Sequence, residues 1–525
     1  MAANEETPLL HAHEAEHKTK SDRVRAKFAL YGSFLGILLA AADDSLVITT
    51  WSVIASDFHR LSQGSWLLAA YNFGWCVSLP VYGTLCELHG PKNILLTAYT
   101  IFAAGCLACG LSTSLVQLVL ARVLAGMGAG GMVSLVSIIL TDMVTPDEVA
   151  VLRGYANVSN VVGRSLGAPL GGYLIGAVGW RWSFLGQIPV VAICLLIGLY
   201  GLPSSFNSAK SGDVTDEGGA RRSGITRFDF SGLVSFAIAI ILLLFLVQDL
   251  SAAPDYLLAP PSILVPAFSA AVILFVAIEA YWAHNPLIPL HLVKTSLGGF
   301  CLNQALMMSS RVGLLSNLTP YMIRVKNATD AFASTAYVLS AVGVSFGALI
   351  AGKVIKRSKR YRTMTVIAVG GAIVTYLLIF IRWRTGCYLW ELVYLFPNGM
   401  AIGILFTTQF IGMSLDVPKE HLSTCITTYY LFQQLGNVVG PSTNVAIVQR
   451  VFLGQLKKNL NGWDEQKFIG QIINENRFAQ RLSLPVRQIV RWSYLNAFQW
   501  VPLISAACAL LMLPTVLWVK EQKIE

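Results

Sequence analysis

The sequence predicts an all-α membrane protein with fourteen transmembrane helices, and three observations support that prediction. Of its 525 residues, 55% are hydrophobic and 13% are charged, whereas a soluble domain carries about 25% charged residues. The mean hydropathy is +0.61. Apolar stretches recur at about the 20 residues that a helix needs to cross a bilayer. These features exclude a soluble globular enzyme, a disordered chain and a collagen-like fibre.

The apolar stretches follow one another with short connections, so they form one polytopic membrane body rather than several soluble domains. The first stretch begins after 27 polar residues and has no small-residue cleavage site, which indicates a span rather than a signal peptide. The fourteen expected spans cover residues 28–55, 65–86, 94–113, 117–141, 156–177, 184–202, 230–249, 261–282, 297–323, 332–355, 363–382, 388–413, 425–452 and 494–519.

Basic residues gather in the loops. Lys+Arg 38 against Asp+Glu 28 gives a formal charge of +10. Between apolar stretches, this excess indicates membrane topology rather than nucleic-acid binding. The N-tail, the loop after the sixth span and the basic segment 353–362 lie on one side, which we expect to face the cytosol. The basic loop 453–493 falls on the other side and argues against this assignment.

The nine cysteines are expected to be small core residues. Most lie inside apolar stretches, including Cys106 and Cys109, which form a C-x-x-C pair, and no Cys/His cluster has metal-ligand spacing. We therefore assign no disulfide framework, no metal and no bound cofactor.

Two adjacent acids interrupt the first span. Carboxylates in a membrane helix are costly and usually mark an ion or substrate pathway, so Asp43 and Asp44 are candidates for a protonatable pair. The alternative is that one of them simply neutralises a buried arginine. Arg122 in the fourth span needs such a partner, and Asp43 or Asp44 is the natural candidate. Glycines that follow Arg122 allow neighbouring helices to pack closely.

The loop between the second and third spans carries a recognisable pattern. The stretch G-T-L-C-E-L-H-G-P-K resembles the cytosolic loop signature of the major facilitator superfamily, with Gly83, Glu87, Gly90 and Lys92 at the signature positions. Glu87 stands where the signature usually has Asp, and Pro91 stands where it usually has a basic residue. The resemblance implies a gating role for this loop at the cytosolic face.

The fifth span carries a second pattern, in Gly163, Gly167, Pro169, Gly171 and Gly172. It resembles the antiporter signature of the drug:H+ antiporters in the same superfamily, with the proline displaced by one residue. This variant and the following stretches 179–184 and 187–189 resemble the fungal vacuolar basic amino acid transporters. Glycine and proline also allow tight packing and bending of a helix.

The resemblance covers nearly all of residues 28–520. It implies the major facilitator fold, in which two six-helix halves are joined here by two inserted helices. The expected organisation is an N-tail at 1–27, a six-helix bundle at 28–203, a linker at 204–229, the inserted helices at 230–296, a second bundle at 297–519 that contains the loop 453–493, and a C-tail at 520–525. The glycine and basic residues at 352–357 echo the first loop signature, which indicates an internal repeat.

The chain carries two candidate signals for location. Glu5, Leu9 and Leu10 resemble an acidic dileucine sorting signal, which sorting adaptors bind in vacuolar membrane proteins. Asn327 begins a glycosylation sequon on the side opposite the cytosol. We therefore expect a vacuolar membrane protein, with the plasma membrane as the alternative.

The resemblance implies a proton-coupled transporter that moves amino acids, in particular Lys, Arg and His, into the vacuole in exchange for protons. Asp43 and Asp44 would carry the proton, the cationic substrate or each in turn, and Arg122 would sense their protonation. Arg311 in the ninth span would order water or bind the substrate carboxylate, or else pair with Glu279 or Asp416.

Polar residues of the ninth and twelfth spans either line the cavity or form interhelical hydrogen bonds. They are Asn303, Gln304, Ser309, Ser310, Asn398, Thr407, Thr408 and Gln409.

Two other functions share these features. The same fold serves multidrug efflux at the plasma membrane, and a non-transporting nutrient sensor can be built on a transporter scaffold. An enzyme and an ATP-driven pump are disfavoured, because no nucleophile–base constellation and no Walker-type loop occur. The expected partners are a small-molecule substrate, protons and the bilayer, with no nucleic acid, and we expect a monomer.

Overall fold

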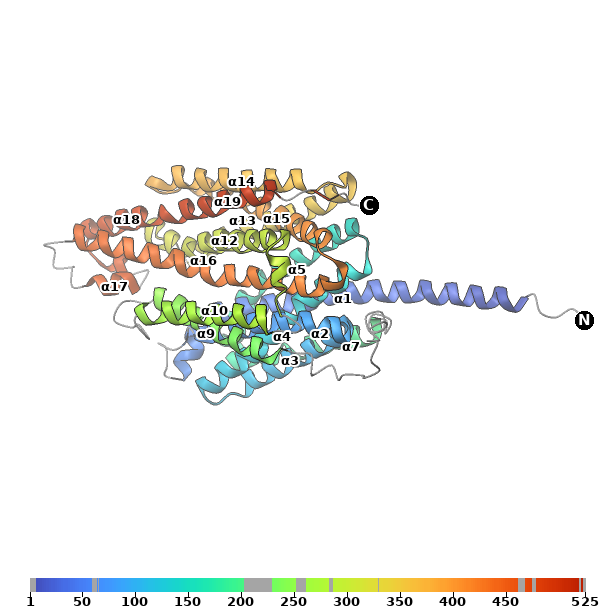
Figure 1. Ribbon diagram of the computed structural model, residues 1–525. Coiled ribbons are helices and arrows are strands. Elements are labelled where there is room, and N and C mark those ends of the chain that lie inside the picture. The colour runs from blue at the N-terminus through green and yellow to red at the C-terminus, as the bar shows by residue number, and fades with distance from the viewer. Residues whose placement is uncertain are drawn as a thin grey trace, which may run out of the picture. The chain divides into compact units, whose positions relative to one another are not determined.

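The computed structural model is helical throughout its described elements (Figure 1). It describes residues 6–58, 64, 66–202, 229–251, 261–282, 287–328, 330–460, 468–474, 478–518 and 521–522. All fourteen expected spans coincide with helices in this part of the chain. Ten helical segments there are long and apolar enough to cross a membrane. The chain is therefore an all-helical, multi-pass membrane protein.

The helices group into two compact units that alternate along the chain. Unit 1 comprises residues 1–143 and 162–226, and unit 2 comprises residues 144–161 and 227–525. The helices of unit 1 are α1 (Glu6–Asp57), α2 (Trp66–His89), α3 (Pro91–Leu111), α4 (Leu115–Met143), α6 (Trp180–Leu185) and α7 (Ile188–Gly201). Helix α5 (Pro146–Val178) begins in unit 2 and ends in unit 1.

Unit 2 holds the inserted hairpin and the second set of long helices. The hairpin is α9 (Phe230–Ser251) and α10 (Pro261–Tyr281). The others are α11 (Leu290–Val293), α12 (Ser296–Lys326), α13 (Asp330–Ser358), α14 (Arg362–Arg382), α15 (Leu395–Asp416), α16 (Leu422–Asn459), α17 (Ile469–Asn474), α18 (Leu484–Phe498) and α19 (Trp500–Trp518). Short 3-10 turns connect some of these helices.

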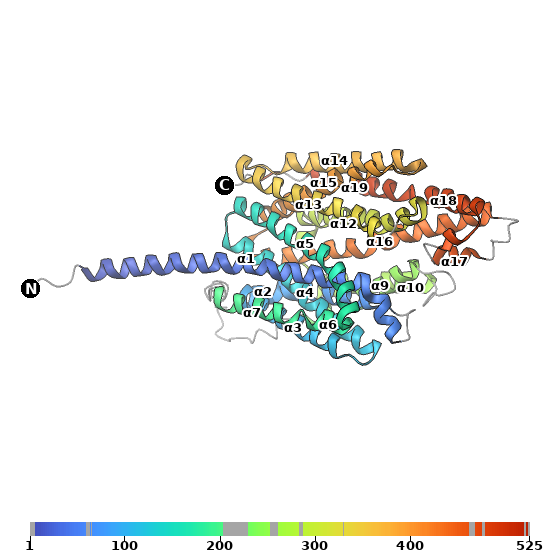
Figure 2. The same cartoon turned by 180° about the vertical axis from the view of Figure 1, so that it is seen from behind.

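Glycines let helices of unit 1 approach through their backbones. A Cβ atom on Gly74 of α2 would lie 2.0 Å from the carbonyl oxygen of Val123, and one on Gly126 of α4 would lie 2.1 Å from that of Tyr71. No side chain fits at such distances, so these positions require glycine. Helix α7 lies along α1 and α3 (Figure 2).

Unit 2 repeats this packing. A Cβ on Gly347 of α13 would lie 2.0 Å from the carbonyl oxygen of Met400 in α15. The helices α13 and α15 are the second and fourth of their half, as α2 and α4 are of theirs. The same backbone contact therefore recurs at equivalent helices, which supports the internal repeat.

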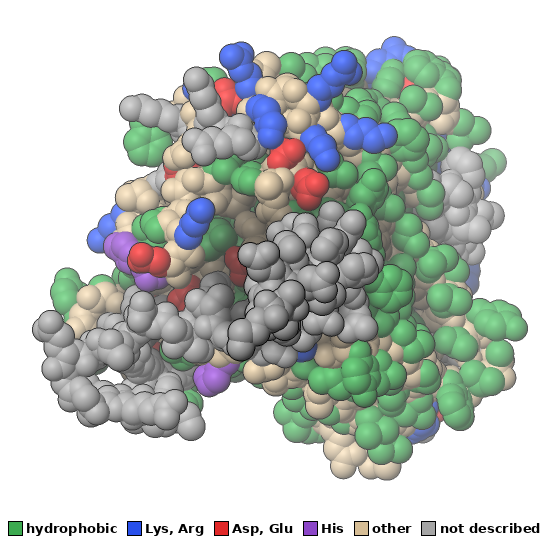
Figure 3. All heavy atoms as spheres, turned by 90° about the vertical axis from the view of Figure 1, so that its right-hand side faces the viewer, with side chains coloured by type: hydrophobic (Ala, Val, Ile, Leu, Met, Phe, Trp, Pro, Cys, Tyr) green, Lys and Arg blue, Asp and Glu red, His purple; other side chains and the backbone are tan. Residues whose placement is uncertain are grey.

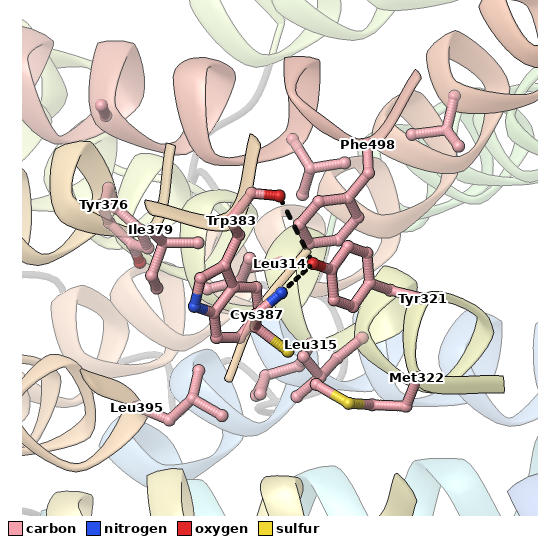
Figure 4. Close-up of a cluster of buried hydrophobic side chains, with 14 of the residues drawn as sticks. Leu314, Leu315, Tyr321, Met322, Tyr376, Ile379, Trp383, Cys387, Leu395 and Phe498 are labelled. Carbon is pink, nitrogen blue, oxygen red and sulfur yellow. Dashed lines mark hydrogen bonds between the residues drawn. The ribbon is translucent and has the colours of Figure 1, made fainter. Parts of the chain in front are cut away.

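An aromatic cluster fills the core of unit 2 at one end (Figure 4). The Tyr321 ring stacks on Trp383 at 5.4 Å between centroids and lies 4.3 Å from Phe498. Its hydroxyl accepts a hydrogen bond from the Cys387 backbone N–H at 3.0 Å and donates to the Trp383 carbonyl at 3.4 Å. The cluster joins α12, α18 and the 3-10 turn Trp383–Thr385 that follows α14. Buried aromatic rings of this kind contribute much of a core's stability.

Helices extend into the N-tail and into the loop 453–493. Helix α1 begins at Glu6, so the polar N-tail continues the first span as a helix. Its Ala, Glu, Lys and Arg residues have high helix propensity, which explains this extension. In the described part of the loop 453–493, α16 runs to Asn459, α17 covers Ile469–Asn474 and α18 starts at Leu484.

Candidate functional site

Asp43 and Arg122 form a buried ion pair in unit 1. The Arg122 Nη1 atom donates to Asp43 Oδ2 at 2.6 Å, and the two side chains are 1% and 0% exposed. Asp43 lies on α1 and Arg122 on α4, so the pair joins two helices. Burial of both charges is tolerated only because each neutralises the other.

A buried amide holds the second oxygen of this carboxylate. Gln187 donates from Nε2 to Asp43 Oδ1 at 3.0 Å and to the Ser183 carbonyl at 2.9 Å. The Cys106 thiol lies 3.9 Å from Gln187 Oε1. Both Asp43 oxygens therefore have donors, which fixes the carboxylate between α4 and the start of α7.

Aromatic rings cover the arginine. The guanidinium carbon of Arg122 lies 4.2 Å from the Tyr71 ring centroid and 5.8 Å from that of Phe184. The Tyr71 hydroxyl donates to the Ala40 carbonyl at 3.1 Å, which fixes the ring. Within the described residues, Arg122 Nε and Nη2 have no hydrogen-bond partner. The cation thus keeps unused donors inside the protein.

Asp44 has a different partner and a different exposure. Successive helix residues point about 100° apart, and Asp44 faces α5, where Arg164 Nη2 lies 3.3 Å from its Oδ2 atom. The Arg164 and Asp44 side chains are 25% and 18% exposed. Ser45 anchors the same contact by donating to the Arg164 carbonyl at 2.6 Å. One acid is therefore sealed, while its neighbour is partly accessible.

These groups form two ion pairs whose acids are adjacent in α1. Protonation of Asp43 would remove its attraction for Arg122 and leave the guanidinium to seek another anion.

The sequence profile of the Major Facilitator Superfamily matches residues 33–441. The chain belongs to the major facilitator superfamily. It is therefore a secondary transporter of small molecules and not an enzyme.

Two fungal relatives and one solved structure illustrate the likeness. The vacuolar membrane amino acid uptake transporter fnx2 of Schizosaccharomyces pombe is 30% identical over 496 residues, covering 93% of this chain and 83% of that protein. The vacuolar basic amino acid transporter 1 of Saccharomyces cerevisiae is 26% identical over 442 residues, covering 79% and 76%. The proton:xylose symporter XylE matches with a TM-score of 0.58 at 12% identity, covering 96% of this chain and 97% of that one, which shows the shared fold.

The superfamily loop signature lies at the turn between α2 and α3. Gly90 adopts a φ of 79°, a left-handed conformation that favours glycine, and Pro91 starts α3. Gly83 is buried and Glu87 is half-buried on the last turns of α2. Lys92 is 8% exposed and donates to the carbonyls of Leu199 and Leu202. It therefore caps the end of α7.

The fifth-span signature packs α5 against α1. Cβ atoms on Gly163 and Gly167 would each lie 2.2 Å from a carbonyl oxygen, those of Leu38 and Ala42, and one on Gly171 would lie 2.8 Å from Leu46. The motif thus places the backbone of α5 beside the segment that carries Asp43 and Asp44. Pro169 lies inside α5 and is exposed, and Gly172 lies one residue beyond Gly171 in the same helix.

Two glycines of α16 repeat this contact in unit 2. A Cβ on Gly436 of α16 would lie 2.4 Å from the Ala305 carbonyl oxygen, and one on Gly440 would lie 2.4 Å from the Ser309 Cα. Both contacts join α16 to α12. The fifth helix of each half therefore packs against the first through glycines.

Arg311 is buried in unit 2. It is 7% exposed on α12, and its guanidinium carbon lies 6.0 Å from the Phe406 ring centroid. Glu279 Oε1 accepts the Ile288 N–H, and Asp416 Oδ1 accepts Gln522 Nε2. The role of Arg311 and its pairing with Glu279 or Asp416 stay predictions.

The polar residues of α12 and α15 form interhelical hydrogen bonds in unit 2. Asn398 Nδ2 donates to Thr375 at 3.0 Å, and Gln304 Nε2 donates to Gln433 at 3.0 Å. Further bonds of this kind join Asn303 to Gln409, Tyr429 to Gln304, Tyr376 to Ser310, Ser309 to the Gly436 carbonyl and Thr407 to the Ala348 carbonyl. Thr408 instead donates within its own helix, to the Leu405 carbonyl.

The location signals have simple structural settings. Asn327 is exposed and ends α12 in a left-handed conformation, with a φ of 54°. Leu9 and Leu10 lie near the start of α1, and Glu5 lies outside the described residues. Glycosylation and sorting stay predictions.

Sequence reasoning missed three groups. It gave no role to Gln187, although an amide that follows an apolar stretch was a detectable signal. It did not name Arg164 as the partner of Asp44. It overlooked Arg153, which is 4% exposed, bonds to the Tyr430 hydroxyl and lies 4.1 Å from the Phe410 ring centroid in unit 2.

Proposed function

We propose that this chain is a proton-coupled antiporter that moves amino acids, in particular the basic ones, into the vacuole. The observation that carries the proposal is the sealed pair of Asp43 and Arg122. A fully buried carboxylate held by an arginine and an amide can exchange one proton for one ion-pair partner. This exchange is what coupling to a proton gradient requires.

We assign different tasks to the two acids. Asp43 is the proton site, because its carboxylate is sealed and its protonation frees the buried Arg122 cation from the ion pair. Asp44 is the contact for a cationic substrate group, because it is partly exposed and its 3.3 Å contact with Arg164 is longer than the Asp43 pair. An entering ammonium group would compete with Arg164 for the same carboxylate.

The two steps combine into an exchange cycle. When a proton from the acidic lumen reaches Asp43, Arg122 loses its counter-ion. The freed guanidinium then disfavours a second cation nearby, so the substrate leaves. Release of the proton on the cytosolic side restores the pair and readies Asp44 for the next substrate.

The substrate class is supported by the relatives. The fnx2 protein is named as an amino acid uptake transporter, and the Saccharomyces cerevisiae protein as a basic amino acid transporter. Unlike a neutral drug, a basic amino acid offers the ammonium or guanidinium group that an exposed carboxylate recognises.

Uptake into isolated vacuoles tests this function. Vacuoles from cells that express the chain should accumulate labelled Lys, Arg or His when acidified, and collapse of the pH gradient should abolish the accumulation. Labelled cationic drugs are the comparison arm. Drug transport without amino acid transport, or a tagged protein found at the cell surface, would favour multidrug efflux and contradict the proposal.

A further inference from the structure

The base of the inserted hairpin contains a second pair of acids, separate from the site in unit 1. Asp229 lies just before α9, and Glu279 lies near the end of α10. The two helices pack against each other, with the rings of Phe236 and Phe275 5.2 Å apart. Both acids belong to unit 2.

Each carboxylate uses one oxygen for the backbone. Asp229 Oδ1 accepts the Ser231 hydroxyl at 2.7 Å and the Gly232 N–H at 2.9 Å, as an N-cap does. Glu279 Oε1 accepts the Ile288 N–H at 2.7 Å. These bonds hold both carboxyl groups in place.

The other oxygen of each acid has no partner among the described residues. Asp229 Oδ2 and Glu279 Oε2 are both buried and unsatisfied. The Glu279 side chain is 4% exposed. A Cβ atom on Gly232 would lie 2.3 Å from Asp229 Oδ2 and 2.9 Å from Glu279 Oε2. The two oxygens therefore converge on Gly232, which has no side chain.

The surrounding helices supply no described counter-charge. The nearby α9, α10, α11 and α16 carry other ionisable groups, none of which has a described hydrogen bond or ion pair with either acid: Asp249, Tyr281, His291, Cys425, Tyr429, Tyr430, Arg450, Lys457 and Lys458. Two like charges buried side by side cannot both ionise at low cost.

We infer that Asp229 and Glu279 form a proton-binding site that holds one proton between them at neutral pH. The proton sits on Glu279, the more buried acid, and the neutral carboxyl group faces the Asp229 carboxylate. The site would load and release its proton with the pH at the end of the hairpin that is expected to face the cytosol. It does not depend on the proposed substrate or direction of transport.

Infrared spectroscopy of the purified full chain tests this inference. At about pH 7, the difference spectrum of wild type minus Glu279→Gln should show the carbonyl band of a protonated carboxyl group, lost in the variant. Glu391→Gln is the matched control, because Glu391 is 0% exposed but pairs with Arg382 at 2.8 Å. Its difference spectrum should contain no such band.

Thermal unfolding provides a second readout. A carboxyl group that stays protonated only in the folded protein makes stability fall as pH rises. The melting temperature of the wild type should decrease from about pH 6 to about pH 8, and Glu279→Gln should lose at least half of that decrease. Glu391→Gln should lower the melting temperature equally at both pH values.

Asp229→Asn covers the case in which Glu279→Gln does not fold. Asparagine keeps the cap on α9, and loss of the like charge should move the decrease to lower pH. Absence of the infrared band, or a loss of stability in Glu279→Gln that is equal at both pH values, would overturn the inference, since it would identify a paired carboxylate.

Discussion

Asp43 and Asp44 are neighbours in the sequence, but the helix sends them to different partners. Asp43 meets Arg122 and Gln187 in a sealed contact, whereas Asp44 meets Arg164 where both side chains keep some exposure. The sequence predicted that one of the two would pair with Arg122 but could not say which. That choice depends on the rotation of α1 against α4, which no single-sequence pattern specifies.

Asp43→Asn should cost about 3–5 kcal/mol of stability, because it leaves the Arg122 cation buried without a counter-ion. Arg122→Gln should cost a similar amount. The double variant should recover much of the loss, since no unpaired charge remains. Thermal unfolding of the four proteins gives the coupling energy. Additive losses in the double variant would show that the pair is not coupled.

At the scale of elements, the glycine faces of α5 and α16 hold each half together. Replacement of Gly167 by Ala should destabilise the protein by about 1–3 kcal/mol, because its Cβ would lie 2.2 Å from the Ala42 carbonyl oxygen. Gly370→Ala in α14 is the control, because nothing lies within 4 Å of its Cβ. It should be neutral or stabilise by about 0.5–1 kcal/mol. Equal effects in thermal unfolding would contradict the packing role.

The start of α5 is tied to the loop after α13 by an ion pair in unit 2. Asp147 Oδ2 lies 3.5 Å from Lys359 Nζ. A hydrogen bond with the Thr145 side chain, and then the Lys359 charge, lower the pKa of Asp147. Figure 3 shows Lys and Arg side chains gathered with a few acids on the face it presents.

A lowered pKa means that this contact contributes stability above the usual Asp value, about 3.9, and loses it as pH falls through the folded value. Asp147→Asn should therefore lower stability by less than about 1 kcal/mol, because the pair is partly exposed. The loss should be constant from about pH 5 to about pH 8. A loss that changes over this range would mean that another group titrates with the pair.

An arginine of α12 contacts α17, in the described part of the loop 453–493. Arg324 donates from Nη2 to the carbonyls of Ile472 and Ile473 at 3.2 and 2.7 Å, at the end of α17. Arg324→Gln should speed hydrogen exchange in residues 469–474, while Arg384→Gln, at an exposed position, should not. Equal exchange in the two variants would contradict this role for Arg324.

At the scale of the whole molecule, hydropathy predicted the positions of the helices well, because each span must be apolar over its whole length. The signal is weaker for α2, α5, α12 and α16, which are long enough but are not among the ten clear apolar spans of the described residues. These helices carry polar residues such as Arg164, Asn303 and Gln304. Their spans were still recognisable as apolar stretches of about 20 residues.

The pairing of charges could be predicted only in part. The pairing of Arg122 with one of two acids followed from the cost of an unpaired charge in a membrane. The partners of Arg153 and Glu279 did not, because they depend on which helices lie side by side. Motifs indicate contacts within a half, and they contain no information about single buried oxygens.

The most direct test of the account separates exchange from accumulation in proteoliposomes. Wild-type protein should accumulate labelled lysine inside acidic liposomes, and it should also exchange labelled for unlabelled lysine without a pH gradient. Asp43→Asn should lose the accumulation, because the proton site is gone. It should keep a weaker exchange that needs more lysine, because the Asp44 contact survives beside an Arg122 cation that has lost its counter-ion. Accumulation by Asp43→Asn at the wild-type level would contradict the central claim that Asp43 couples proton movement to transport.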